Sequence, residues 1–513
     1  MVPILPPAMG NTTVGIVYLV GAGPGDPGLI TLRGVECLRR AEVIVYDYLA
    51  NPLILQHAPP GAEKICLGRH ESDQRWSQEE IQALLVRHAR QGRVVVRLKG
   101  GDPGVFGRGA EEIEALRTAG IPYETIPGVT AAFAAAAYAD IPVTHGLHSS
   151  AVALVTGQER HCKQGEGLDY LALAGFPGTL IFYMGTTSAR VWSEALIRGG
   201  KPPATPVAIV RRCSWNDQEV VRCTLGDVAE VVARRNIRPP TVIVVGHVVD
   251  LAPEVSWFAA RPLFGQRILL TRPERQNAPV AHRLRELGAE VLVQPAIEIG
   301  PPRDWQEVDR VLRALDRYEW IVFSSANGVQ FFLDRLETLH GDVRRLGRAR
   351  IAAIGPGTAE ALRRYHVRAD LVPDAFRAEA LAEALLKGTH GQNFLLIRAS
   401  RGREVLAEQL AAAGKQVEQV VAYQSTDVAE PAREVLQAMA AGKIDWVTVT
   451  SSAIAQSLAR LFGETLRRTR LASISPVTSA TLATLGFPPT VEATRYTMDG
   501  LVEAILSASR GKS

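Results

Sequence analysis

VYLVGAGPGDPGLITLRG, residues 17–34, passes from a β-branched run through a turn rich in glycine and proline into a segment that can begin a helix. Gly23, Gly25 and Gly28 spell G-x-G-x-x-G, and the next apolar run, AEVIVYD, ends at Asp47. A strand, this glycine spacing and a later acidic residue are typical of dinucleotide-binding α/β domains. The stretch therefore indicates an α/β domain and raises the question of its ligand.

The chemistry of the turn argues against a dinucleotide. Pyrophosphate binding needs backbone N–H groups at a helix N-terminus, and Pro24 and Pro27 lack this donor. Asp26 before Pro27 has the pattern of an N-cap followed by the first helical residue, so a carboxylate would occupy the positive end of the helix. No G-K-[ST] follows, and a P-loop is also disfavoured.

A second turn of similar composition follows another strand-like run. RLKGGDPGVFGRGAEE, residues 97–112, carries Gly-Asp-Pro at 101–103, as the first turn does at 25–27. Because the carboxyl ends of parallel strands lie at one edge of a sheet, the two turns should outline one crevice with two carboxylates. Such a crevice suits a ligand with hydroxyls, an amine or a positive charge.

Strand-like runs alternate with amphipathic helical runs through the chain, which predicts an α/β fold with largely parallel sheets. One predicted helix begins with a capping box formed by Ser77 and Glu80. The pattern of the first half ends near Phe258, and a fresh strand pattern begins at RILLTRP. We expect a first domain over 14–258, a linker over 259–264 with the boundary near 262, and a second domain over 265–513.

The second half contains a weak internal sequence repeat, here called the echo. WIVFSSANGVQFFL (320–333) followed by RIAAIGPGTAEAL (350–362) resembles WVTVTSSAIAQSLA (446–459) followed by LASISPVTSATLATL (471–485). Each member reads as a strand, a hydroxyl- or glycine-rich turn and a helix. The turns either present helix N-termini to anions or only cap their helices. The echo predicts two lobes, the first over about 265–298 plus 427–513 and the second over about 299–426.

Composition limits the class of protein. The chain has 513 residues, 47% hydrophobic and 21% charged, enough for several globular domains. No apolar run reaches the roughly 18 to 20 residues of a membrane span, and the first residues lack the basic region of a signal peptide, so we expect a cytoplasmic protein without membrane contact. The five cysteines have no C-x-x-C spacing, which predicts reduced thiols and no metal site.

The net charge of +4 is small for this length, and no basic block indicates nucleic acid. The arginines reflect either an arginine-rich proteome or contacts to a polyanionic small molecule.

Four segments of the first half, over about residues 14 to 258, resemble uroporphyrinogen-III C-methyltransferase: VGAGPGDPGLITLRG, VVRLKGGDPGVFGRGAEE, TIPGVTAAFAAAAYADIPVTH and FYMG. The resemblance implies two α/β domains with S-adenosylmethionine as the cofactor, no metal, and a homodimer formed through this half. It assigns to the cofactor site Pro24, Gly100, Gly101, Asp102, Val105, Phe106, Thr130, Ala131, Met184 and Cys213. Asp102 and Met184 have the alternative roles of a turn cap and a core residue.

The resemblance also implies catalytic residues. Asp47 matches the proposed proton acceptor of the family, with a capping role as the alternative. The proposed proton donor, a lysine, aligns with Arg69, and because arginine does not release a proton near neutral pH, Arg69 would instead pair with a substrate carboxylate. Gly146 and Cys213 also depart from the family pattern, which has arginine and a small glycine-containing turn at these places.

The second half, about 263 to 513, resembles uroporphyrinogen-III synthase through the order of LLTRP, FSSANGV, IGPGTAEAL, RASRGREVLAEQL, VVAYQS and VTSSAIAQSL. This family converts hydroxymethylbilane to uroporphyrinogen III, the substrate of the methyltransferase. The resemblance implies catalytic roles for Tyr423 and Thr450, with a hinge role as the alternative for Tyr423. It implies substrate contacts by Arg272, Ser324, Ser325, Arg398 and Ser451.

The two resemblances together predict a bifunctional enzyme that makes precorrin-2 from hydroxymethylbilane. Two other functions stay open at this point. The first half could methylate at another tetrapyrrole step or act on a different substrate class. The second half could be a two-lobed module that binds a tetrapyrrole without catalysis.

Overall fold

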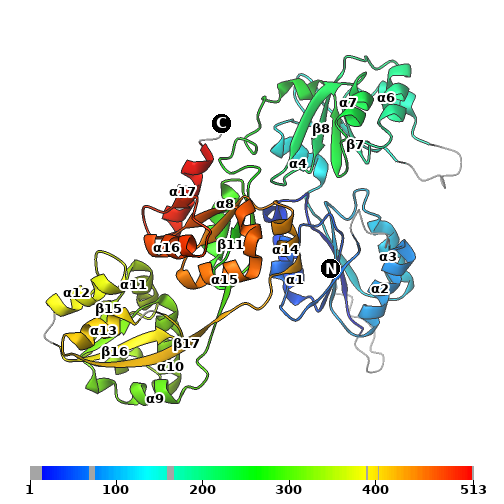
Figure 1. Ribbon diagram of the computed structural model, residues 1–513. Coiled ribbons are helices and arrows are strands. Elements are labelled where there is room, and N and C mark those ends of the chain that lie inside the picture. The colour runs from blue at the N-terminus through cyan, green and yellow to red at the C-terminus, as the bar shows by residue number, and fades with distance from the viewer. Residues whose placement is uncertain (1–13, 69–75, 159–166, 389–390, 403, 511–513) are drawn as a thin grey trace. The chain divides into compact units, whose positions relative to one another are not determined.

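The computed structural model describes residues 14–68, 76–158, 167–388, 391–402 and 404–510 (Figure 1). The chain divides into two compact units, Met1–Gly265 and Gln266–Ser513. Each unit contains two five-stranded sheets covered by helices, so the chain is an α/β protein, as the alternating pattern predicts.

The first sheet of unit 1 is wholly parallel, with strand order β3-β2-β4-β1-β5. Side chains alternate across it: Tyr18 and Val20 pack toward α1, whereas Val17 and Leu19 pack toward α2 and α3. Burial on both faces explains the continuous apolar run of the opening strand. The elements are β1 (Val17–Gly21), η1 (Pro27–Leu29), α1 (Leu32–Arg40), β2 (Val43–Tyr46), η2 (Pro52–His57), β3 (Glu63–Cys66), α2 (Gln78–Arg90), β4 (Val95–Lys99), α3 (Gly109–Thr118) and β5 (Tyr123–Ile126).

The second sheet of unit 1 has the order β6-β7-β10-β8-β9, and only β6 and β7 are parallel. The expectation of largely parallel sheets is therefore wrong for this sheet. β8 and β9 are joined by a short turn, which permits only an antiparallel pair because a parallel pair needs a long crossover. The elements are α4 (Ala131–Tyr138), β6 (Val152–Thr156), α5 (Tyr170–Ala174), β7 (Thr179–Tyr183), α6 (Ala189–Arg198), β8 (Pro206–Arg211), β9 (Glu219–Thr224), α7 (Val228–Arg234), β10 (Thr241–Val245) and η3 (His247–Leu251).

Two predicted helix starts have different outcomes. The capping box of α2 is confirmed: Ser77 Oγ accepts from the Glu80 N–H, and the Glu80 carboxylate accepts from the Ser77 N–H. Asp26 does cap the turn at Pro27, but this turn is only the three-residue η1. The long helix α1 begins later, with Thr31 as its N-cap.

Unit 2 is built from two lobes, each with its own sheet. One sheet is wholly parallel, with the order β12-β11-β18-β19-β20. Its elements are β11 (Arg267–Leu270), η4 (Glu274–Gln276), α8 (Ala278–Glu286), β12 (Glu290–Val293), α14 (Arg433–Ala440), β18 (Trp446–Val449), α15 (Ser452–Phe462), η7 (Gly463–Arg468), β19 (Arg470–Ser473), α16 (Pro476–Thr484), β20 (Val491–Glu492) and α17 (Met498–Arg510).

The other sheet has the order β13-β17-β16-β14-β15, in which only β13 is antiparallel to its neighbour. Its elements are β13 (Ile297–Gly300), α9 (Gln306–Arg313), η5 (Leu315–Arg317), β14 (Trp320–Phe323), α10 (Ala326–His340), η6 (Val343–Leu346), β15 (Arg350–Ala353), α11 (Pro356–Arg363), α12 (Ala378–Gly388), β16 (Asn393–Ala399), α13 (Val405–Ala412) and β17 (Gln416–Asp427). The sequence echo corresponds to β14-α10-β15-α11 in this lobe and β18-α15-β19-α16 in the other.

The segment 259–264, expected to be a linker, packs onto unit 1. Leu263 is fully buried, and the rings of Phe258 and Phe264 lie 5.3 Å apart. The Gly265 N–H donates to the Asn216 carbonyl oxygen at 3.0 Å. The compact first unit therefore continues to Gly265.

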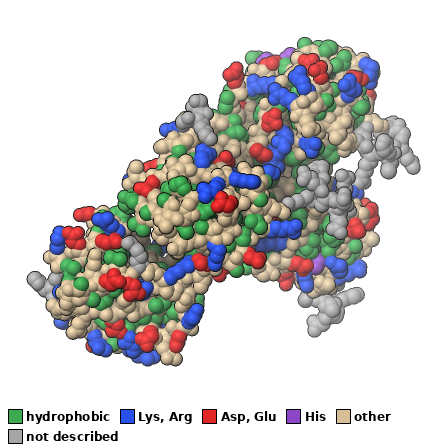
Figure 2. All heavy atoms as spheres, in the orientation of Figure 1, with side chains coloured by type: hydrophobic (Ala, Val, Ile, Leu, Met, Phe, Trp, Pro, Cys, Tyr) green, Lys and Arg blue, Asp and Glu red, His purple; other side chains and the backbone are tan. Residues whose placement is uncertain are grey.

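In the described ranges, no helix is long and apolar enough to cross a membrane. Cys37, Cys66, Cys213 and Cys223 are free thiols, whereas Cys162 lies outside the described residues. On the face shown in Figure 2, basic and acidic side chains are interspersed.

Candidate functional site

The two Gly-Asp-Pro turns meet at the carboxyl edge of the first sheet. β1 and β4 are parallel neighbours, and the turns that follow them are joined by two backbone hydrogen bonds between Gly23 and Gly101, of 3.2 and 2.8 Å. A cavity of about 720 Å³ lies at this place and extends to residues of the second sheet. The structure thus confirms that the two turns border one crevice.

The cavity is lined by every residue that the family resemblance assigns to the cofactor site, and by Asp47. These residues come from five separate parts of unit 1 and are Pro24, Gly100, Gly101, Asp102, Val105, Phe106, Thr130, Ala131, Met184 and Cys213. Arg69 lies outside the described residues.

The carboxylates of the two turns are already engaged. Asp26 accepts hydrogen bonds from the Tyr138 hydroxyl and the Gly28 N–H, both at 2.8 Å, and does not line the cavity. Asp102 does line it, and its two oxygens accept from the N–H groups of Gly104 at 2.7 Å and Gly128 at 2.9 Å. The expectation of two carboxylates in the crevice is therefore wrong for Asp26, because that side chain joins the turn to α4.

Backbone strain is concentrated around the cavity. Phe106, Arg108, Met184 and Arg212 line it and have φ angles of 50°, 58°, 53° and 47°, in the left-handed region that non-glycine residues rarely adopt. Strain of this kind persists where the surrounding structure enforces it, often at functional sites. Phe106 and Met184 stay about two-fifths exposed and provide an apolar wall.

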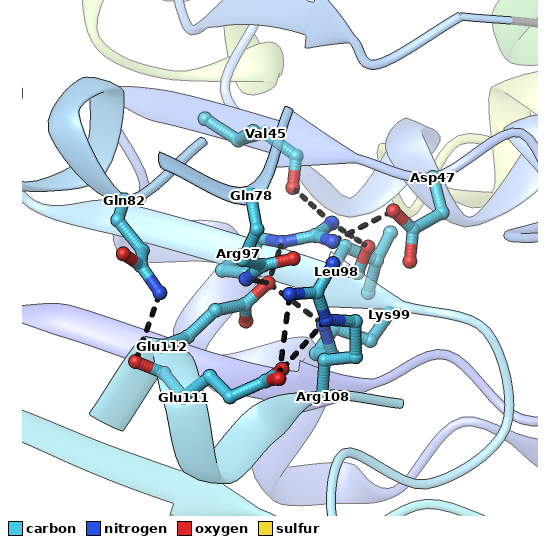
Figure 3. Close-up of polar contacts among 10 residues, drawn as sticks. All are labelled: Val45, Asp47, Gln78, Gln82, Arg97, Leu98, Lys99, Arg108, Glu111 and Glu112. Carbon is cyan, nitrogen blue, oxygen red and sulfur yellow. Dashed lines mark hydrogen bonds and ion pairs between the residues drawn. The ribbon is translucent and has the colours of Figure 1, made fainter. Parts of the chain in front are cut away.

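The floor of the cavity is a buried charge cluster that sequence reasoning missed (Figure 3). Arg97 and Lys99 on β4 are each 2% exposed, and Glu112 on α3 is 1% exposed. One oxygen of Glu112 accepts from Lys99 Nζ at 2.9 Å, Arg97 Nε at 3.2 Å and Gln78 Nε2 at 3.4 Å. The far side of the Arg97 guanidinium donates to Asp47 Oδ1 at 2.7 Å. Arg97 therefore links the buried Glu112 to the cavity-lining Asp47.

This cluster had a signal in the sequence. The run VVVRLKG places two cations two residues apart in an otherwise apolar strand, so both must lie on one buried face. Burial, together with the nearby Arg97 charge, lowers the pKa of Lys99. Buried cations need a buried anion, and Glu112 supplies it.

Two further groups around the cavity are neutral at physiological pH. Burial raises the pKa of the Cys213 thiol to about 12. Burial also raises the pKa of Tyr183, whose hydroxyl lies 2.6 Å from Thr130 Oγ1 and accepts from the Ala132 N–H at 2.8 Å. Tyr183, in the FYMG segment, is a lining residue that sequence reasoning did not single out.

In unit 2, Tyr423 and Ser325 are brought together. Their hydroxyl oxygens lie 2.9 Å apart, and Phe331 stacks on the Tyr423 ring at 5.9 Å. Burial raises the pKa of Tyr423, so the hydroxyl stays protonated. Sequence reasoning missed Asn327, which accepts a hydrogen bond from Gln276 of the other lobe at 2.8 Å.

The remaining predicted residues of unit 2 fall into two groups. Arg272 and Thr450 follow the neighbouring parallel strands β11 and β18. Burial lowers the pKa of Arg272, and no carboxylate pairs with it among the residues described. Arg398 is instead held by Glu404 at 2.7 Å and Gln419 at 2.8 Å.

The predicted serines have structural partners. Ser325 and Ser451 occupy equivalent places in the two lobes, and each accepts from a backbone N–H as the N-cap of its helix. Ser324 Oγ donates to the Ile397 carbonyl oxygen at 3.0 Å.

Comparisons with known proteins match both halves. A family model described as Tetrapyrrole (Corrin/Porphyrin) Methylases matches residues 16–229, and one described as Uroporphyrinogen-III synthase HemD matches residues 278–503. The Porphyrin biosynthesis protein HemD of Ruminiclostridium josui is 35% identical over 85% of this chain and 87% of that protein. The uroporphyrinogen-III C-methyltransferase of Bacillus subtilis is 38% identical over 70% of this chain and 74% of that protein.

A solved structure of the uroporphyrin-III C-methyl transferase from Thermus thermophilus, complexed with S-adenyl homocysteine, is 40% identical with a TM-score of 0.40. It covers 46% of this chain and 100% of that chain. The matches to the family models and the long relatives confirm the resemblance that the motifs indicate. The chain belongs to the family of bifunctional tetrapyrrole-biosynthesis enzymes in which an N-terminal uroporphyrinogen-III C-methyltransferase is joined to a C-terminal uroporphyrinogen-III synthase.

Proposed function

We propose that unit 2 closes hydroxymethylbilane to uroporphyrinogen III and that unit 1 methylates this product twice, with S-adenosylmethionine, to precorrin-2. The observation that supports the proposal best is the cavity of unit 1. It gathers the assigned cofactor residues and the Asp47 carboxylate around one space of about 720 Å³, in the range of small-molecule sites.

The lining of the cavity is chemically suited to S-adenosylmethionine. An added Cβ at Gly100 would lie 2.8 Å from Leu49 Cβ, and Gly101 has a φ of 68°, so both positions need glycine beside the cavity. Val105, Phe106 and Met184 offer apolar surface, while Thr130 offers a hydroxyl. The cofactor supplies an electrophilic methyl group on a sulfonium.

We propose that the residues of unit 1 align the pyrrole and accept its proton. A methylated pyrrole carbon leaves positive charge on the ring, which the loss of one proton neutralises. Asp47 is the acceptor that we propose, since its carboxylate lines the cavity and Arg97 fixes its orientation. Phe106 and Tyr183, whose rings lie 5.1 Å apart, would exclude water from this space.

We propose that the residues of unit 2 hold and polarise the linear substrate. In this proposal the neutral Tyr423 hydroxyl, which contacts Ser325, donates a hydrogen bond to the departing hydroxyl group. The partly buried Arg272 is suited to a substrate carboxylate. Thr450 lies beyond the end of the neighbouring strand as a second donor. We further propose a cytoplasmic enzyme that forms a homodimer through unit 1.

The test is a two-stage incubation of the full chain. With hydroxymethylbilane alone, we expect the type-III ring, and after addition of S-adenosylmethionine we expect two successive methyl additions by mass spectrometry. The spontaneous type-I ring as the only product of the first stage would instead favour a non-catalytic second half. Light scattering of the same sample tests the dimer.

A further inference from the structure

The turn between β8 and β9, residues 212–218, closes over the first Gly-Asp-Pro turn. Trp215 Nε1 donates to the Pro24 carbonyl oxygen at 3.2 Å, and Ser214 Oγ accepts from the Asp26 N–H at 3.0 Å. An added Cβ at Gly25 would lie 2.2 Å from Trp215 Nε1, so the indole rests directly on the backbone there. The turn is therefore fixed against the wall of the cavity.

Arg212 begins this turn in a strained conformation that its neighbours enforce. Its φ of 47° is uncommon for a non-glycine residue. Its N–H donates to the Pro240 carbonyl oxygen at 3.0 Å, and its own carbonyl oxygen accepts from the Trp215 N–H at 3.1 Å. A strained backbone that is held in this way at a cavity wall indicates a side chain placed for a purpose.

The guanidinium of Arg212 is held in one orientation, but only part of its hydrogen-bonding capacity is occupied. It lies over the Trp215 ring with Cζ 4.3 Å from the centroid, and its Nε donates to Asp217 Oδ1 at 2.7 Å. The two terminal nitrogens have no hydrogen-bond partner among the described residues. The side chain is one-quarter exposed and lines the cavity. A planar guanidinium that is fixed through Nε leaves its two terminal nitrogens available to an anion.

The carboxylates that line the cavity cannot be that anion. Asp47 is paired with Arg97, and Asp102 is engaged by two backbone N–H groups. Asp217 is half exposed and does not line the cavity. The free guanidinium edge is therefore available to an anion that a ligand brings into the cavity.

We propose that Arg212 binds a carboxylate of a ligand in this cavity. The inference rests on the proposed function, in which two ligands carry carboxylates: the tetrapyrrole with its acidic side chains, and S-adenosylmethionine with its amino-acid end. Stacking on Trp215 orients the guanidinium before the ligand arrives, which lowers the entropy cost of a bidentate contact.

Equilibrium binding to the full chain tests this without turnover. The probes are uroporphyrin III, the oxidised octacarboxylate, and S-adenosylhomocysteine, which keeps the amino-acid carboxylate. Asparagine tolerates the left-handed backbone, so R212N removes the charge without new strain. We expect R212N to weaken the binding of one probe about tenfold or more, the usual range for a lost hydrogen bond to a charged group. R212K should recover part of the lost affinity. The probe that weakens identifies the source of the carboxylate.

Two further variants make the result decisive. R190N removes an arginine that is paired with Glu194 on α6, away from the cavity, and should change neither affinity. D217N keeps an amide oxygen that can accept from Arg212 Nε, so the guanidinium stays oriented and D217N should weaken the binding of the affected probe less than R212N does. Unchanged affinities in R212N, or equal losses in R212N and D217N, would overturn the proposal. Failure of the unchanged protein to methylate uroporphyrinogen III would contradict the proposed function, and the binding arms would still test Arg212.

Discussion

Two aspartates in identical Gly-Asp-Pro tripeptides have different environments. Asp26 joins its turn to Tyr138 of α4, whereas Asp102 lines the cavity and ties two loops together through Gly104 and Gly128. Local sequence determines the turn, and the surrounding chain determines what the carboxylate contacts.

For Asp102 we expect that substitution by alanine both destabilises unit 1 and weakens the binding of S-adenosylhomocysteine. The partly buried Gly128 N–H loses its acceptor, which costs about 1–3 kcal/mol, whereas the exposed Gly104 N–H can bind water instead. Thermal unfolding and calorimetry measure the two effects. D169A is the matched control, since Asp169 also accepts from two N–H groups, as the exposed N-cap of α5. Equal losses of cofactor affinity in both variants would remove Asp102 from the site.

For Asp47 we expect D47N to slow methyl transfer on the order of 10²-fold while S-adenosylhomocysteine still binds. Asparagine keeps an oxygen for Arg97 Nη2, so the geometry is preserved while the proton acceptor is lost. Single-turnover methylation and calorimetry measure the two quantities. A rate close to that of the unchanged protein would make Asp47 a structural residue.

At the scale of elements, α3 and β4 are joined by the charge cluster in Figure 3. Glu112 is the buried anion opposite the two cations Arg97 and Lys99. A buried ion pair contributes little compared with apolar packing, but removing one partner leaves an uncompensated charge. The junction between helix and strand therefore depends on a single carboxylate.

We expect E112Q to lower the free energy of unfolding by about 3–5 kcal/mol, the range for breaking a buried pair. E111Q is the matched control on the same helix, because Glu111 pairs at the surface with Arg108 and such pairs contribute about 1 kcal/mol or less. Urea unfolding measures both. Similar losses in the two variants would contradict a special role of the buried carboxylate.

The loss of unfolding free energy in E112Q should depend on pH. Because the folded pKa of Lys99 is below its usual value, the folded state holds fewer protons than the unfolded state between these two pKa values, and stability rises with pH there. Without Glu112 the folded pKa falls further and this window widens toward lower pH. The deficit of E112Q should therefore shrink as the pH is raised from 7 toward 10. A constant deficit over this range would contradict the linkage.

At the scale of the whole molecule, the chain is two compact units, and each contains one of the two family matches. We propose that the functional boundary follows Gly265, since Phe264 packs against Phe258 and the Gly265 N–H donates to the Asn216 carbonyl oxygen. A cut near 262 would remove this packing from the methyltransferase.

We expect residues 1–265 to methylate supplied uroporphyrinogen III and residues 266–513 to close hydroxymethylbilane to the type-III ring without S-adenosylmethionine. Product analysis by chromatography checks each piece, and circular dichroism confirms that it is folded. A piece ending at residue 261 should be less stable than one ending at 265. If the folded C-terminal piece gave only the type-I ring, the synthase assignment would fail for that unit alone.

Local patterns in the sequence determined the α/β class, the capping box of α2, the shared crevice of the two turns and the family of each half. These depend on neighbours in sequence and on strand ends that lie at one edge of a sheet. Three features could not be predicted in this way: the mainly antiparallel second sheet of unit 1, the engaged carboxylate of Asp26 and the position of Arg212. They depend on contacts between residues far apart in the chain, such as Trp215 with Pro24 or Tyr138 with Asp26, because only the packed structure decides which buried polar group finds which partner.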